Sequence, residues 1–233
     1  MLLPLFDYLA DFYGPFRVFE YLSLRTILST LTAFLLALFF GPKFIHSMKE
    51  NQVAQVVRDD GPISHLDKAG TPTMGGTLIL TSILISNLIW GDLGNKYLWT
   101  VLFVTIFFGA LGWYDDHLKI KKNNSRGLSP KSKLLWQSII AIFASLFLFY
   151  TAQTDSETAL IVPFLKDVSI PLGVFFIFLS SLVILGTSNA VNLTDGLDGL
   201  AILPCVMVAG GLGVIGYAAG NTFYSDYLNI PFI

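Results

Sequence analysis

Two adjacent carboxylates, Asp115 and Asp116, directly follow the uncharged stretch 97–114, which is long enough to cross a membrane as a helix. Adjacent carboxylates repel each other, and at the C-terminal end of a helix they also oppose the helix dipole. A bound cation would relieve both effects, so the pair is a candidate Mg²⁺ site, and either carboxylate is a candidate general base. If the helix continues, Lys119 shares a face with Asp115, because the two are four residues apart. The alternative is a helix end exposed to water.

A second polar cluster occupies residues 189–199, between two further apolar stretches. Within it Asn192, Asp195 and Asp198 are spaced by three residues, which would place all three on nearly one face of a helix. Gly196 allows close backbone approach or a break in that helix. Oxygen ligands of this kind suit an Mg²⁺ ion that is held partly by substrate phosphates, and a polar turn is the alternative.

A third cluster, residues 68–76, joins Lys68 to a loop of Gly, Thr and Pro residues that contains Thr73 and opens another apolar stretch. Free N–H groups at a helix N-terminus attract anions, and glycines let a phosphate approach closely. A plain turn is the alternative. Six cations between 119 and 133, among them Lys133, orient the chain in a membrane or receive an anionic substrate or lipid head group.

The composition predicts which elements position these clusters. Of the 233 residues, 54% are hydrophobic and 13% are charged, against about 25% charged in a typical globular domain. The uncharged stretches predict six transmembrane helices, at about 26–42, 69–91, 97–114, 134–154, 168–187 and 199–220. We therefore expect an all-α, polytopic membrane helix bundle that forms a single domain over residues 1–233. This composition and a net charge of −2 exclude a disordered chain, a secreted disulfide scaffold and a nucleic-acid-binding domain.

The basic residues predict how the bundle is oriented. Ten of the 14 Lys and Arg residues fall within 43–68 and 119–133, two loops that lie on the same side of a six-span bundle. The positive-inside rule places these loops in the cytoplasm and both termini outside. All three polar clusters then lie on the cytoplasmic face. Residues 1–21 are dense in Phe and Tyr, which predicts an N-terminal interfacial segment at the level of the lipid head groups.

Together the clusters supply carboxylates for a metal ion and N–H groups and cations for phosphates, on a face that both water and the bilayer reach. This combination suits phosphoryl transfer from a water-soluble donor to a lipid acceptor, a reaction that depends on positioning and charge neutralisation. A membrane transporter is the rival class, but its ionisable residues would lie near the bilayer midplane. A structural membrane subunit would not need the aspartates.

Three motifs closely resemble those of the phospho-N-acetylmuramoyl-pentapeptide transferase family, within the polyprenyl-phosphate hexosamine-1-phosphate transferase superfamily. They are Thr-Pro-Thr-Met-Gly-Gly at 71–76, Asp-Asp-His-Leu-Lys at 115–119 and Asn-Leu-Thr-Asp-Gly-Leu-Asp-Gly at 192–199. The aspartate pair is common to the superfamily, whereas the other two motifs are much more specific to this transferase. Relatives that transfer N-acetylglucosamine-1-phosphate from UDP-GlcNAc are the nearest alternative.

The resemblance implies a bacterial inner-membrane enzyme of peptidoglycan biosynthesis. It would transfer phospho-MurNAc-pentapeptide from UDP-MurNAc-pentapeptide to undecaprenyl phosphate, giving lipid I and UMP, with Mg²⁺ as cofactor. A homodimer is a further expectation. Whether Asp115 deprotonates the lipid phosphate for direct attack, or an aspartyl–phosphosugar intermediate forms, stays open.

The same resemblance implies which residues form the site. The catalytic pair is Asp115 and Asp116. The metal-binding residues are Asp115, Asp116 and Asn192. The substrate-binding residues are Lys68, Thr73, Lys133, Asn192, Asp195, Gly196, Leu197 and Asp198, with Gly196 and Leu197 near the uracil.

The sequence departs from the family in the number of spans. Family members have about ten spans, and the absent spans carry a further metal-binding aspartate and a His-rich cytoplasmic loop. We therefore expect residues 1–233 to correspond to the N-terminal part of the family fold. Alone, they are expected to insert into a membrane without catalysing the transfer.

Overall fold

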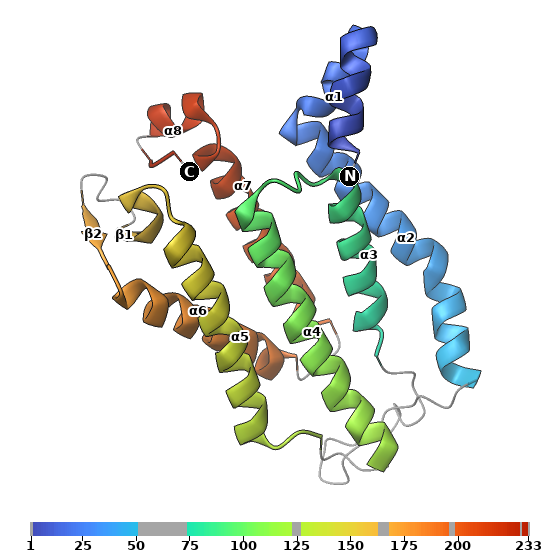
Figure 1. The fold of residues 1–233 in the computed structure, drawn as a ribbon. Coiled ribbons are helices and arrows are strands. Elements are labelled where there is room, and N and C mark those ends of the chain that lie inside the picture. Colours follow the sequence, from blue (N-terminus) through green and yellow to red (C-terminus); the bar gives the residue numbers. More distant parts are fainter. Residues whose placement is uncertain are drawn as a thin grey trace. The chain divides into compact units, whose positions relative to one another are not determined.

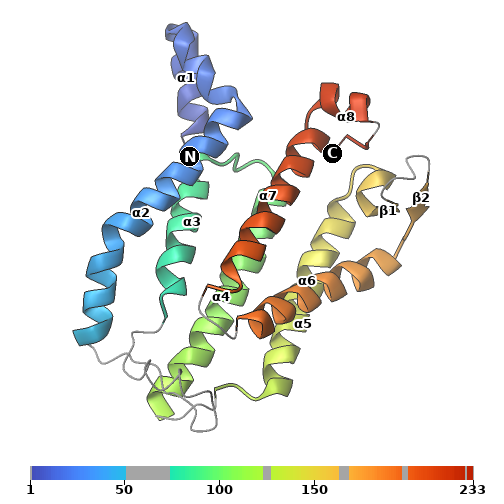
Figure 2. The ribbon, with the colours of Figure 1, turned by 180° about the vertical axis from the view of Figure 1, so that it is seen from behind.

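The computed structural model describes residues 2–50, 74–122, 127–162, 168–195, 199–228 and 230–232, and helices dominate it (Figures 1 and 2). The α-helices are α1 Leu3–Phe12, α2 Leu22–Glu50, α3 Gly76–Trp90, α4 Lys96–Lys122, α5 Pro130–Thr151, α6 Phe175–Thr194, α7 Ile202–Ala219 and α8 Thr222–Leu228. Two short 3₁₀ helices, η1 Gly14–Glu20 and η3 Asp155–Thr158, and two three-residue strands, β1 Ala159–Ile161 and β2 Ser169–Pro171, complete the described elements. The predicted all-α class is confirmed.

Five of these helices, α2 and α4 to α7, are long and apolar enough to cross a membrane. The shorter apolar helix α3 corresponds to the remaining predicted span. At 1.5 Å per residue its 15 residues extend roughly 22 Å, less than the hydrocarbon thickness of about 30 Å. The predicted membrane helix bundle is therefore confirmed as a class.

The helix boundaries differ from the predicted spans where turns interrupt apolar sequence. The span predicted at 168–187 begins with strand β2, which pairs antiparallel with β1, and α6 begins only at Phe175. Gly173, with φ of 51°, makes the turn between β2 and α6. Helix α4 extends eight residues beyond its predicted end at 114, and α2 likewise extends beyond 42. Hydropathy measures how much apolar chain is available, but it does not fix where each helix starts.

The chain divides into two compact units, residues 1–136 and 137–233, each described by itself. In the first unit α2 and α3 contact each other along a polar seam. Ser29 donates a hydrogen bond to Ser86 (3.3 Å), and the Trp90 indole N–H donates one to Thr32 (3.0 Å). Hydroxyl pairs of this kind hold helices together where no water is available.

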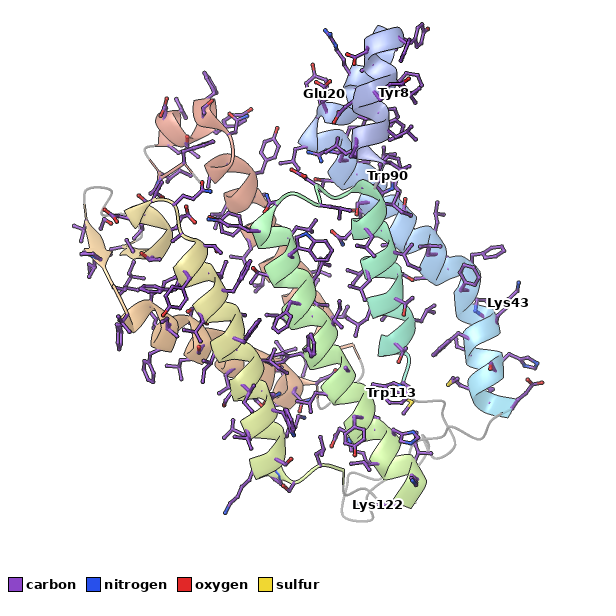
Figure 3. All side chains as sticks on the ribbon, in the orientation of Figure 1. Tyr8, Glu20, Lys43, Trp90, Trp113 and Lys122 are labelled. Atoms are coloured by element: carbon purple, nitrogen blue, oxygen red, sulfur yellow. The ribbon has the colours of Figure 1, made fainter. Side chains whose placement is uncertain are left out.

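The N-terminal segment folds onto the end of α3 within the first unit. The rings of Phe6 and Phe19 stack at 4.0 Å between centroids, and each stacks on Trp90 at 6.1 Å. Figure 3 shows Trp90 where α3 meets this segment. The predicted interfacial segment is thus built from α1 and η1, and its placement at the head groups stays a prediction.

In the second unit α5 and α6 contact each other through a second polar seam. Asn189 donates a hydrogen bond to Gln137 (3.0 Å), and Ser181 donates one to Ser145 (3.1 Å). From the first of these hydrogen bonds to the second, the residue on α6 moves back along the chain by eight positions, while its partner on α5 moves forward by eight. The two helices are therefore antiparallel. Between Gln137 and Ser145 lies Ala141, which has no exposed surface.

Enlarging Ala141 tests this seam. Ala141→Leu is expected to lower the free energy of unfolding by about 1–3 kcal/mol, because Ala141 has no exposed surface and the added carbons must displace its neighbours. Thermal unfolding of the purified protein in detergent measures the loss. The control is Ala209→Leu on the exposed surface of α7, which should leave the transition unchanged. Equal effects of the two substitutions would mean that the seam is not tightly packed.

Candidate active site

Asp115 and Asp116 lie on α4, which continues past them to Lys122 (Figures 1 and 3). The alternative interpretation, in which the pair marks a helix end, is therefore wrong, and so is the predicted end of this span at residue 114. The last turn of α4 instead carries Lys119, Lys121 and Lys122, which interact favourably with the negative end of the helix dipole. The carboxylates project from a continuous helix, whose backbone fixes their directions.

Lys119 holds both carboxylates. Its ammonium group lies 2.7 Å from Oδ2 of Asp115, four residues before it, and 2.9 Å from Oδ1 of Asp116, three residues before it. The predicted shared face of Asp115 and Lys119 is confirmed. The ammonium group of Lys119 thus relieves the repulsion between the adjacent carboxylates. The sequence alone suggests a metal ion for this task.

The second oxygen of Asp115 is held by the turn that precedes α5. The backbone N–H of Leu128 donates a 2.6 Å hydrogen bond to Oδ1 of Asp115. Gly127 lies against the same carboxylate, and a Cβ added there would fall 2.7 Å from Cγ of Asp115 and 3.0 Å from Cε of Lys119. Only glycine fits at this position without displacing its neighbours. Asp115 is consequently 13% exposed, whereas Asp116 is 38% exposed.

Lys133 lies in the first turn of α5, directly after this turn. The hydroxyl of Ser129 accepts a hydrogen bond from the N–H of Ser132, which caps the helix, and Pro130 occupies its first position. The charge of Lys133 attracts the Asp115 carboxylate. The structure thus brings three of the predicted site residues, Asp115, Asp116 and Lys133, together around the junction of α4 and α5.

Asn192 and Asp195 lie at the C-terminal end of α6, in the second unit, and both are exposed. The helix ends at Thr194, and Asp195 leaves the helical conformation with φ of −76° and ψ of 47°. Of the two possibilities that the sequence left open, a continuous helical face or a break, the described residues show the helix ending at Thr194. Gly196 and Asp198 lie outside the described residues. The end of α6 is anchored by Asn189, through its hydrogen bond to Gln137.

The remaining predicted site residues lie outside the described residues. They are Lys68, Thr73, Gly196, Leu197 and Asp198. The described chain resumes at Met74, which has a positive φ of 67°, and α3 follows from Gly76.

Three contacting residues were absent from the predicted site: Lys119, Gly127 and Leu128. The spacing of Lys119 from the aspartates could have included it, since pairs three and four residues apart meet on a helix. The contact of Gly127 and Leu128 with Asp115 depends on a turn more than ten residues away. No local sequence signal encodes it.

The carboxylate pair fits an Mg²⁺ site in which the protein supplies only some of the ligands. This ion is commonly held by one or two carboxylates together with substrate phosphates and water, rather than by a cage of protein ligands. Within the described part of the chain, no three His, Cys, Asp or Glu side chains form a metal-binding group. Lys119 is the described partner of Asp116 and contacts only Oδ1, so Oδ2 is the oxygen of the pair best placed to meet a cation.

Comparison with known families agrees with this arrangement. Residues 98–230, more than half of the chain, match the model of glycosyl transferase family 4. The chain therefore belongs to this family. Residues 68–80 match signature 1 of phospho-N-acetylmuramoyl-pentapeptide transferase, as the resemblance predicted. Together the two matches identify a membrane transferase of phospho-sugars that acts on polyprenyl phosphate.

Proposed function

We propose that the chain contributes the cytoplasmic site that transfers phospho-MurNAc-pentapeptide from UDP-MurNAc-pentapeptide to undecaprenyl phosphate in peptidoglycan synthesis. Overall, the phosphoanhydride bond of the donor breaks and UMP leaves, while a new phosphoanhydride bond joins the β-phosphorus to a phosphate oxygen of the lipid and gives lipid I. The observation that supports this most is the match at 68–80 to a signature of phospho-N-acetylmuramoyl-pentapeptide transferase. It occurs in the same chain as the aspartate pair of α4.

Each group has a physical task in this proposal. The resemblance assigns Asp115, Asp116 and Asn192 to Mg²⁺, which neutralises phosphate charge when bound. Lys68, Thr73 and Lys133 supply cationic and polar groups for the phosphates. By the resemblance, Asn192, Asp195 and Asp198 would supply acceptors for the nucleotide and sugar, and Gly196 and Leu197 are assigned to the uracil.

The proposed function is tested by measuring which nucleotide-sugar donor the protein uses. The resemblance assigns further site residues to spans absent from residues 1–233, so the assay uses a fusion protein in which the C-terminal spans of a family member follow residue 233. Labelled UDP-MurNAc-pentapeptide and labelled UDP-GlcNAc are supplied in turn, with undecaprenyl phosphate and Mg²⁺. Lipid-linked label from the first donor supports the proposal. Label from UDP-GlcNAc alone would favour the N-acetylglucosamine-1-phosphate transferases instead.

The proposed site lies on the cytoplasmic face of the bacterial inner membrane, with both termini outside. A cysteine in place of Lys122, in a Cys205→Ala background, should react with an impermeant maleimide only after the cells are opened. The control is Asp92→Cys, in the exposed turn between α3 and α4, which should react in intact cells. The opposite pattern would reverse the topology.

A further inference from the structure

The two carboxylates of the pair have unequal surroundings. Both oxygens of Asp115 have protein partners, Oδ2 the ammonium of Lys119 at 2.7 Å and Oδ1 the N–H of Leu128 at 2.6 Å. Asp116 shares the same lysine through Oδ1 alone and is about three times as exposed. With one short hydrogen bond on each oxygen, Asp115 has fewer lone pairs left for a substrate or an ion than Asp116 has.

The partners of Asp115 come from two different elements. Lys119 belongs to its own helix, whereas Leu128 belongs to the turn before α5. Gly127 permits the contact, because any larger residue would meet the carboxylate and the stem of Lys119. The side chain of Asp115 therefore ties the turn to α4, and with it the first residues of α5, including Lys133.

We propose that Asp115 is a positioning residue, which locks the Gly127–Leu128 turn and Lys119 in place, and that Asp116 is the carboxylate of the pair that meets the metal ion and phosphates. This proposal rests on the proposed function. It gives different roles to two aspartates that the resemblance treats as equivalent. The lock fixes Lys119, which in turn holds Oδ1 of Asp116 at 2.9 Å, whereas Lys119 makes no contact with Oδ2.

Conservative and truncating substitutions separate the two roles. In Asp115→Asn the amide oxygen still accepts from Leu128, and Lys119 keeps Asp116 as a partner. In Asp115→Ala no acceptor remains. A positioning residue is rescued by Asn, whereas a base, nucleophile or metal ligand needs the negative charge.

The first readout is hydrogen exchange at the Leu128 amide, resolved at single residues, in the 233-residue protein reconstituted in lipid nanodiscs. Asp115→Ala and Gly127→Ala are expected to speed exchange at least about tenfold, since each removes a hydrogen bond to a charged acceptor. Asp115→Asn and Asp116→Asn should leave it near the unsubstituted rate. Gly112→Ala on α4 is the matched control, because a Cβ there has no neighbour within 4 Å.

The second readout is transfer by the fusion protein. Asp115→Ala should lose most turnover. Asp115→Asn should keep turnover within about tenfold of the unsubstituted protein, whereas Asp116→Asn should lose most of it. Equal losses in the two Asn variants would overturn the proposal, as would unchanged exchange in Asp115→Ala. If the unsubstituted fusion makes no lipid-linked product, the proposed function fails, while the exchange rates still decide whether Asp115 locks the turn.

Discussion

Asp116→Asn in the fusion protein is expected to reduce phospho-sugar transfer by roughly 10³-fold, the loss typical of removing one electrostatic group from a preorganised site. The amide has the shape of the carboxylate, so Lys119 keeps its partner Asp115 and the helix is undisturbed. What disappears is the negative charge of the carboxylate, which our proposal assigns to the metal ion and the donor phosphates. Initial rates at saturating donor and Mg²⁺ measure the effect.

The matched control for this substitution is Asp226→Asn, which makes the same change at an exposed position of α8. The control should retain the unsubstituted rate. Retained turnover in Asp116→Asn, with normal protein in the membrane, would remove this carboxylate from the reaction.

Lys119→Glu is the second substitution with a large expected effect, and we expect it to lower transfer about 10²-fold or more. It replaces the cation that contacts both aspartates by a third carboxylate within one turn of helix, so the three groups repel each other. The same fusion assay measures the loss, and intrinsic stability is followed by thermal unfolding.

Lys121→Glu provides the comparison, because it makes the same charge change in the same helical turn at an exposed position. Its rate should stay within about fivefold of the unsubstituted protein, as expected for an exposed charge. Similar losses in the two variants would show that the net charge of the last turn of α4 matters, and not the specific pairing of Lys119 with the aspartates.

The predictable parts of this fold are those that depend on local sequence. Apolar length predicted six helical regions, and spacing alone predicted that Asp115 and Lys119 share a face. Helix ends were less predictable, because they depend on turns. Gly173 delays the start of α6, and the last Lys residues of α4 extend that helix beyond the apolar stretch.

The unpredicted part of the candidate site depends on contacts between distant residues. The hydrogen bond from Leu128 to Asp115 needs the turn before α5 to fold back on α4. The anchor of α6 joins Asn189 to Gln137, across 52 residues of chain. A motif identifies Asp115 and Asn189 as polar residues near a membrane face, but only tertiary structure gives each its partner.

The nucleotide released during the reaction tests the central claim most directly. A transferase that moves the sugar together with its phosphate releases UMP, whereas one that moves the sugar alone releases UDP. The fusion protein is incubated with UDP-MurNAc-pentapeptide labelled in the uridine, undecaprenyl phosphate and Mg²⁺, and the nucleotides are separated and counted. We expect UMP in amounts equal to the lipid-linked product, and both reduced roughly 10³-fold in Asp116→Asn. Release of UDP with the lipid-linked product would contradict the proposed transfer.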